Sequence, residues 1–459
     1  MSPQPVPHSV PAGGAGPGTG VVPAAGHGPA GAAGPGPRSV EEHRDAVRDL
    51  LHTWFQAHPP ADETLALADA TGRVLAADVH APGSLPPFTN SQMDGYAVRS
   101  ADLQGQAAGT GAGESGTGAG NAPGRIRLGV AAHIPAGTAP APLGPGMAAP
   151  VMTGAMLPAG ADAVVPIEVC IPDRFLPAGG GGRVELPAGI PAGQYVRAAG
   201  SDIAGGALAL PAGTVLGPLQ LGLLAALGLA EASVRSRPRV LLLTTGDEVR
   251  DPGTVLAPGQ IHDANTTLLR TSLEQAGTQV LRSRILADSP EEFTARLRAD
   301  LAADKPDLVL SSGGISKGAY EVVRQALATA DVRFLSVAMQ PGGPQGIGTV
   351  DGTPFLGFPG NPVSSLVSFE MFLRPALTAV TGAPRPRTQV QARLAAPLGS
   401  PAGKYQVRRG RYADGIVEPV GGPGSHLVHA LAVSNALIAV PVGTEHLPAG
   451  AEVTVLLLD

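Results

Sequence analysis

Asp307-Leu308-Val309-Leu310-Ser311-Ser312-Gly313-Gly314-Ile315-Ser316 is the stretch that decides the fold. Its apolar first half follows Lys305-Pro306 and predicts a buried parallel strand. The glycine pair then turns the chain into a helical pattern that starts near Gly318. This arrangement directs backbone N–H groups and a helix N-terminus at one crevice, where a phosphate or another oxyanion is the usual ligand. A plain tight turn is the alternative, because glycine pairs commonly turn corners.

The segment from 239 to 380 alternates strands and helices around this loop. Strands are predicted over 239–245, 279–286, 307–311, 332–337 and 353–358, and helices over 264–276, 290–302, 319–329 and 362–380. Such alternation implies an α/β domain with a doubly wound, mostly parallel sheet and sites at the carboxyl ends of its strands.

The flanking segments differ in composition. Residues 1–38 have almost no large apolar side chains, and we expect a disordered tail. Ser39 and Glu42 form a capping-box pattern that begins a helix over 40–57. Short strands and turns are expected from 64 to 202, with loop insertions at 105–124 and 179–182, and short strands return after 386 as a small β-barrel or sandwich.

Composition excludes several classes of protein. The chain has 459 residues, a formal net charge of −6 and a single cysteine, Cys170. The negative charge argues against a nucleic-acid-coating protein, and one cysteine excludes disulfide frameworks and cysteine metal sites. The N-terminus lacks a secretory pattern, and the apolar run 219–229 is too short for a hydrocarbon core of ~30 Å. We therefore expect a soluble cytoplasmic protein without a nucleic-acid or membrane partner.

Polar residues follow or precede three predicted elements of the sheet. Thr244-Thr245-Gly246-Asp247-Glu248 ends the first strand, and Pro359-Gly360-Asn361-Pro362-Val363-Ser364-Ser365 begins the last helix, with Asn361 at the N-cap. Together with the glycine-pair loop, these ends open on one edge of a doubly wound sheet. The residues expected to hold phosphates there are Thr245, Gly246, Asp247, Ser312, Gly313, Gly314, Ser316, Pro359, Asn361 and Ser364.

Asp247 and Glu248 form a carboxylate pair beside these expected phosphates. Such a pair suits Mg²⁺ or another divalent metal, which binds through one or two carboxylates plus phosphate oxygens. The alternative is that both residues only cap the loop that follows.

Two further motifs lie upstream. Asn90-Ser91-Gln92-Met93-Asp94-Gly95-Tyr96-Ala97-Val98 carries polar residues into a strand, and by itself it predicts a hairpin. Val151-Met152-Thr153-Gly154-Ala155, by itself, predicts an ordinary strand end.

The ordered series NSQMDGYAV, MTGA, TTGDE, SSGGIS, PGNPVSS and the late Gly424-Ser425-His426 resembles the molybdopterin molybdenumtransferase family, the MoeA and gephyrin E-domain group. The resemblance covers about residues 40–459 and implies four domains and an elongated homodimer. The implied domains are an N-terminal linker and dimer domain (39–78 and 203–237), an inserted β-rich domain (79–202), a molybdopterin-binding α/β domain (238–383) and a C-terminal β domain (384–459).

The resemblance also implies a reaction. Adenylylated molybdopterin would be hydrolysed with a divalent metal, and molybdate would be inserted at the dithiolene to give molybdenum cofactor and AMP. Molybdopterin adenylyltransferase, molybdoenzymes and cofactor carriers would be functional partners. The residues that match the family's catalytic positions are Asp94, Thr153, Asp202, Glu248, Asp288, Arg409 and Ser425. The residues expected to bind metal are Asp247, Glu248 and Glu321, although the acidic residue usually found after the SGG loop is altered in this chain and Glu321 is only its nearest match.

These residue types suit that chemistry. Molybdate is a tetrahedral dianion, and Arg409, Ser364 and Ser425 could supply the guanidinium and hydroxyl groups that it needs. Clustered carboxylates could hold the metal for diphosphate hydrolysis.

The chain departs from the family between 336 and 344. Many relatives have lysines in a K-x-x-x-K-P-G-K-P pattern there, whereas this chain has Ser336, Gln340 and Gly343. One hypothesis is that Lys317 restores part of the charge, and the alternative is that Lys317 is a solvated side chain. The neutral run also leaves open a non-catalytic molybdopterin-binding scaffold or carrier. A generic nucleotide-binding α/β enzyme would not explain the NSQMDGYAV segment.

Overall fold

The computed structural model describes residues 36–104, 124–177, 181–286, 289–316 and 321–458. Most of the predicted tail, the insertion at 105–124 and part of that at 179–182 lie outside these ranges, as do Asp288 and Lys317. Helix α1 (Val40–Ala57) has the predicted capping box, because the Ser39 side chain accepts from Glu42 N and the Glu42 side chain accepts from Ser39 N.

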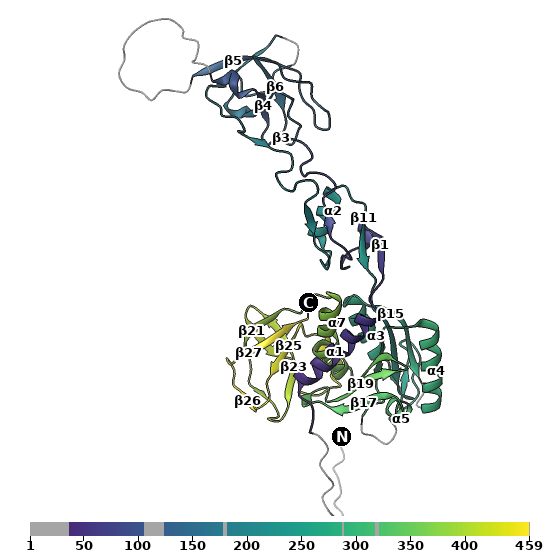
Figure 1. The fold of residues 1–459 in the computed structure, drawn as a ribbon. Helices are drawn as coiled ribbons and strands as arrows, with labels where there is room; N and C mark the ends of the chain where they lie inside the picture. Colours follow the sequence, from purple (N-terminus) through teal and green to yellow (C-terminus); the bar gives the residue numbers. More distant parts are fainter. Residues whose placement is uncertain (1–35, 105–123, 178–180, 287–288, 317–320, 459) are drawn as a thin grey trace, which may run out of the picture. The chain divides into compact units, whose positions relative to one another are not determined.

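A six-stranded sheet forms the centre of the α/β domain (Figure 1). Its order is β15 (Gln279–Leu286), β12 (Arg239–Thr245), β16 (Leu308–Ser312), β20 (Thr353–Phe358), β19 (Pro344–Val350) and β17 (Asp331–Ser336). The first four strands are parallel, and β19 and β17 are antiparallel. The predicted α/β class is confirmed. The sequence analysis does not predict strand β19, however, and the predicted strand β17 pairs with β19 in antiparallel orientation.

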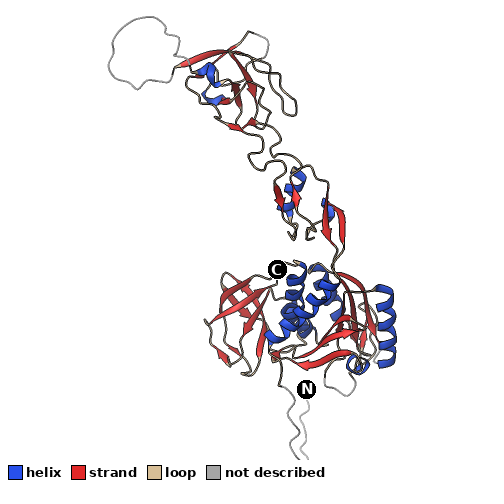
Figure 2. Cartoon of the chain, viewed as in Figure 1, coloured by secondary structure: helices blue, strands red, loops and turns tan. Residues whose placement is uncertain are grey.

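Helices cover both faces of this sheet (Figure 2). Alternate residues of β12 and β16 face opposite cores: Val240 and Leu242 pack with α3 (Asn265–Gln275) and the last helix, whereas Leu241 and Leu243 pack with α4 (Pro290–Asp304) and α5 (Val322–Ala326). The helix predicted over 319–329 is described only as the five residues of α5. Both cores are apolar, as a parallel sheet buried on two sides requires.

The last helix of the domain is one run of three segments: α6 (Pro362–Ser368), a π-helical turn (Phe369–Leu373) and α7 (Arg374–Thr381). Within the described ranges, only this run has the length and composition of a membrane span, but its apolar stretch is 78% buried inside the protein. Val47 and Leu51 of α1 share its core with Phe372. The run is therefore a core helix of this domain.

The C-terminal strands form the predicted small β-barrel. The sheet runs β18 (Met339–Gln340), β23 (Tyr405–Ala413), β24 (Ile416–Pro419), β21 (Gln389–Leu394), β27 (Glu452–Leu457) and β25 (Ala436–Val440), and β25 pairs again with β23 to close it. A two-stranded sheet of β22 (Leu398–Gly399) and β26 (His446–Leu447) and the short helix α8 (Val428–Ala432) accompany it.

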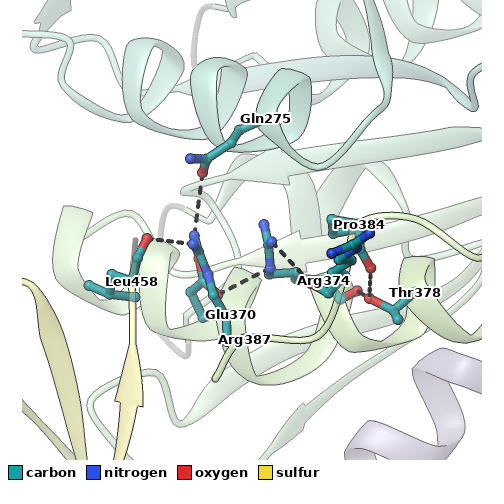
Figure 3. A network of polar contacts seen from close by, with 8 residues as sticks. Gln275, Glu370, Arg374, Thr378, Pro384, Arg387 and Leu458 are labelled. Carbon is teal, nitrogen blue, oxygen red and sulfur yellow. Dashed lines mark hydrogen bonds and ion pairs between the residues drawn. The ribbon is translucent and has the colours of Figure 1, made fainter. Parts of the chain in front are cut away.

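A buried ionic network joins the barrel to the last helix (Figure 3). Glu370 accepts from Arg387, whose Nη1 also donates to the Leu458 carbonyl and whose Nη2 lies 3.3 Å from Gln275 Oε1. Arg374 lies 3.8 Å from the same carboxylate. One buried acid therefore serves two arginines, and the pKa of Arg374 is lowered by its burial and by the charge of Arg387.

The chain leaves α1 and returns to β12 through two β-rich parts. The first pairs β1 (Asp62–Ala66) with β11 (Glu231–Arg235) and β2 (Val79–His80) with β10 (Leu208–Leu210), and contains α2 (Pro218–Ala226). The second has a five-stranded sheet, β7-β4-β6-β5-β8, and the pair β3 (Asn90–Ser91) with β9 (Val196–Arg197). The five strands are β4 (Gly95–Val98), β5 (Arg125–Val130), β6 (Met147–Val151), β7 (Ala163–Pro166) and β8 (Arg183–Pro187).

Candidate functional site

The three polar strand ends of the α/β domain meet at one edge of the sheet, as predicted. Gly313 N donates to Phe358 O over 3.0 Å, which joins the loop after β16 to the end of β20. The hydroxyl oxygens of Ser312 and Ser365 lie 3.2 Å apart, and Ser365 also donates to Pro359 O over 2.5 Å. The glycine-pair loop and the loop that begins α6 are therefore fixed to each other.

Close approach of the loops explains the glycine at 313. Its φ is +93°, and a Cβ at this position would lie 3.0 Å from Thr245 O. A Cβ on Gly360 would likewise lie 3.3 Å from the Cα of Gly313. Backbone from three strand ends thus packs against backbone, which leaves the peptide groups rather than side chains at the centre of this edge.

Buried hydroxyls at these strand ends lack hydrogen-bond partners. Thr245 Oγ1 and Ser311 Oγ are both buried and unpaired. An unmet polar group of this kind costs about 1–3 kcal/mol, so each is a group that a ligand or a water would satisfy. Thr245 is the last residue of β12 and is one of the residues predicted to hold phosphates, whereas Ser311 is the penultimate residue of β16 and is not among them.

The oxygen donors beside these hydroxyls fit a divalent cation. Asp247 is exposed in the turn after β12, and the two carboxylate oxygens of Glu248 lie 3.0 and 3.1 Å from the position of a Cβ on Gly246. Carboxylates and a hydroxyl are hard ligands, and Mg²⁺ uses few of them when a bound phosphate supplies the rest. Across the described ranges no three His, Cys, Asp or Glu side chains converge.

Glu321, the third residue predicted to bind metal, is the N-cap of α5 and makes no side-chain capping bond. Ser316 is exposed after the glycine pair. Asp288 lies outside the described residues, so its predicted role remains a prediction.

Sequence reasoning missed two residues that organise this edge. Asn265, at the start of α3, is buried and donates from Nδ2 to Gly360 O over 2.5 Å. Asp263 accepts from Thr266 N over 3.0 Å, and Thr266 is itself 2.7 Å from the Thr244 hydroxyl. Asp263-Ala264-Asn265 before an apolar helical pattern is a signal that could have identified them, because short polar side chains favour helix starts.

The predicted anion-binding residues lie where the α6 N-terminus meets the barrel. Asn361 is the N-cap, as predicted, although its side chain makes no capping bond. Ser364 is buried in the first turn, and Val363 N donates to Ser425 O over 3.2 Å. Arg409 is buried on β23 and donates from Nη1 to Gly424 O over 3.1 Å and from Nη2 to Gly422 O. The structure thus brings the segments of Ser364, Ser425 and Arg409 together.

Asp94 and Thr153 form a pair within the β-rich domain. Thr153 N and Oγ1 donate to Asp94 Oδ1 over 2.6 and 2.8 Å. The backbone N–H first, and the hydroxyl second, hold the pKa of the Asp94 carboxyl below its usual value. Asp202 is exposed, its backbone N–H donates to Leu85 O, and no hydrogen bond of the described residues joins its carboxylate to this pair.

Comparison with known proteins matches three successive regions of this chain to one family. Residues 38–228 match the MoeA N-terminal region (domain I and II), residues 241–379 a probable molybdopterin binding domain, and residues 391–458 the MoeA C-terminal region (domain IV). Molybdopterin molybdenumtransferase 2 of Mycobacterium tuberculosis (strain H37Rv) is 42% identical over 91% of this chain and 99% of its own. The chain belongs to the molybdopterin molybdenumtransferase family.

Other members of the molybdopterin molybdenumtransferase family agree in extent and in fold. Molybdopterin molybdenumtransferase 1 of the same M. tuberculosis strain is 36% identical over 92% of this chain and 99% of its own. A crystal structure of the molybdopterin biosynthesis MoeA protein from Pyrococcus horikosii covers 92% of this chain and 99% of its own, with a TM-score of 0.74 and 29% identity. The edge where the three strand ends meet lies within the residues that match the molybdopterin binding domain.

Proposed function

We propose that this chain is a molybdopterin molybdenumtransferase that acts in molybdenum cofactor biosynthesis. It would hydrolyse adenylylated molybdopterin and insert molybdate at the dithiolene, and its products would be molybdenum cofactor and AMP. The observation that carries the proposal is the convergence of three strand-end loops, with unpaired buried hydroxyls and a carboxylate pair, within the residues that match a molybdopterin binding domain.

The residues divide the work by their chemistry. Peptide groups at Gly314 and Gly360 and the hydroxyls of Thr245 and Ser312 would orient the phosphates. Asp247 and Glu248 would hold Mg²⁺ or another divalent metal, which supplies neutralisation of phosphate charge when bound. Arg409 and Ser425 would bind molybdate.

AMP release tests this function. The protein is incubated with adenylylated molybdopterin, Mg²⁺ and molybdate, and AMP is quantified by chromatography. We expect AMP release that Glu248→Gln reduces about 10²-fold or more, because a charge that faces the reacting phosphates is lost. The matched control is Glu274→Gln, which removes a surface ion pair of α3. A protein that binds the substrate but releases no AMP would instead be the scaffold or carrier.

A homodimer is also proposed, and an exposed apolar patch supports it. Phe88, Met152, Met156 and Tyr195 are exposed around β3, next to Asp94 and Thr153. Backbone bonds tie them together, since Ala155 N donates to Met152 O and Gln92 N to Tyr195 O. A second copy would cover this patch and bring Asp94 to its active site. Met152→Glu should shift the mass measured by light scattering toward the monomer.

We further propose that the protein works in the cytoplasm beside a molybdopterin adenylyltransferase, and that molybdoenzymes or cofactor carriers receive its product. The chemistry supports this sequence, because the adenylylated substrate must be made by an adenylyl transfer.

A further inference from the structure

Gln345 is a buried glutamine that directly follows the neutral run 336–344. The residue is 1% exposed, and its amide nitrogen has two acceptors, one for each hydrogen. Nε2 donates to Gly342 O over 2.7 Å and to Ser368 Oγ over 2.8 Å. Buried hydrogen bonds of this kind favour a single arrangement of the groups that they join. Gln345 therefore fixes the peptide group of Gly342 relative to helix α6.

The hydrogen bonds continue to Ser364, which lies in the first turn of α6 and is 4% exposed. Ser368 Oγ donates to Ser364 O over 2.8 Å, one helical turn earlier. Gly342 packs against the same turn, because a Cβ at this position would lie 3.3 Å from Ser368 Oγ and 3.5 Å from Ser364 O. Gln345 thus joins the loop to the helix turn that carries Ser364.

The other end of this loop is held by the barrel. Strand β18 precedes the loop and pairs with β23, and Gln406 Nε2 donates to Gln340 Oε1 over 3.0 Å. Strand β23 also carries Arg409. The run 336–344 has no lysine or arginine, so it brings no charge to an anion site. It instead connects the strand that carries Arg409 to the helix turn that carries Ser364.

We propose that Gln345 is a positioning residue of the reaction, which holds the loop 341–344 against the first turn of α6 and thereby sets the separation of Ser364 and Arg409. This inference rests on the proposed function, in which molybdate binds at these residues. Gln345 does not itself touch molybdate and acts through the Gly342 peptide group and the Ser368 hydroxyl. Groups held in place before binding lose less freedom when the ligand arrives, so the affinity is higher.

Binding of molybdate alone, without the pterin, tests the role of Gln345. Gln345→Met keeps an unbranched side chain of similar length and removes both donors. Titration calorimetry at constant ionic strength should show a Kd about three- to tenfold above that of the wild type, which is the effect of one or two lost hydrogen bonds. The matched control is Gln391→Met, which loses a bond of 3.0 Å to Thr454 Oγ1 on the barrel and should bind as the wild type does.

Ser368→Ala provides a second, smaller change, in case Gln345→Met fails to fold. It removes the hydroxyl that links Gln345 to Ser364 and should also raise the Kd for molybdate. In the double variant the two effects should be less than additive, because both substitutions break the same hydrogen bond. In AMP release, Gln345→Met should raise the KM for molybdate and leave kcat within about twofold, because binding groups are displaced and the carboxylates are not.

Hydrogen exchange measures the positioning directly. The amides of Gly342, Gly343 and residues 364–368 should exchange faster in Gln345→Met and at the wild-type rate in Gln391→Met. Wild-type affinity for molybdate in both Gln345→Met and Ser368→Ala, or no binding of molybdate by the wild type, would overturn the assignment. These measurements do not depend on turnover, so their failure is distinguishable from a wild type that binds molybdate but releases no AMP.

Discussion

His43 is a buried base that links α1 to the core of the α/β domain. Its ring meets Phe372 edge-on at 4.6 Å, and Nδ1 lies 3.4 Å from Arg38 Nη1. Burial, and then the charge of Arg38, lower its pKa to about 4. The folded protein therefore keeps this ring neutral at pH values where the unfolded chain binds a proton.

A loss of stability on acidification follows from that difference. The unfolded pKa is near 6.5, so the contribution of His43 is intact above that pH and is lost as the pH falls toward 4, by on the order of 3 kcal/mol. Urea unfolding at several pH values should show this slope in the wild type and not in His43→Gln. His52→Gln, at an exposed position of the same helix, should keep the same dependence of unfolding free energy on pH as the wild type. If His52→Gln lost this dependence, a group other than His43 would be responsible for it.

The Asp94 carboxylate owes its lowered pKa to two donors of one residue. Thr153→Val removes the hydroxyl and keeps the peptide N–H, so the pKa should rise part of the way toward its usual value. Thr153→Ser keeps both donors and should leave it unchanged. A carbon-13 NMR titration of the labelled carboxyl measures both, and equal values in the two variants would contradict the assigned role of the hydroxyl.

Residue types at strand ends were predictable, whereas their long-range partners were not. Ser312, Gly313 and Asn361 lie at the predicted edge because the alternation of strands and helices fixes which ends open together. The partners of Arg409 are loop carbonyls at positions 422 and 424. Any residue type provides a carbonyl, so no sequence pattern marks them.

At the scale of elements, the glycine-pair loop owes its shape to backbone contact. Gly313 and Gly352 both have positive φ, but only Gly313 has a neighbour that a Cβ would strike. Gly352→Ala should therefore lower the free energy of unfolding by about 1 kcal/mol, because alanine is strained in the left-handed backbone conformation. Gly313→Ala should cost about 1–3 kcal/mol more and weaken substrate binding, because Thr245 must move. Thermal unfolding and AMP release measure the two effects, and equal destabilisation would refute the contact.

The hairpin of β19 and β20 shows where local patterns fail. Gly346 and Gly348 weaken the strand signal of β19. The paired structure needs glycine there, because a Cβ on Gly348 would collide with Asp331 O of β17. The contact between β19 and β17 thus requires a glycine, a residue type that weakens a strand signal in the sequence. The antiparallel edge of the sheet could not be predicted for this reason.

At the scale of the whole molecule, Glu370 is the one acid that two arginines of the buried network share (Figure 3). Glu370→Gln leaves both cations without a counter-charge and should destabilise the protein by about 3–5 kcal/mol. Arg387 also donates to Leu458 O at the end of the barrel. In Glu370→Gln the urea unfolding transition should therefore be less cooperative than in the wild type, because the barrel and the last helix are less firmly joined. The exposed pair of Arg270 and Glu274 is the control, and Glu274→Gln should cost less than about 1 kcal/mol.

The antiparallel pair of β1 and β11 has a consequence for whether the rest of the chain can fold without the two β-rich parts. Ser236 N donates to Ala61 O over 2.8 Å, so the polypeptide departs and comes back through neighbouring points. Residues 61–236 are therefore an insertion whose two ends lie next to each other. A gene that splices residues 38–60 to residues 237–459 through a short glycine turn should encode a folded, monomeric remnant, detectable by its dispersed NMR spectrum.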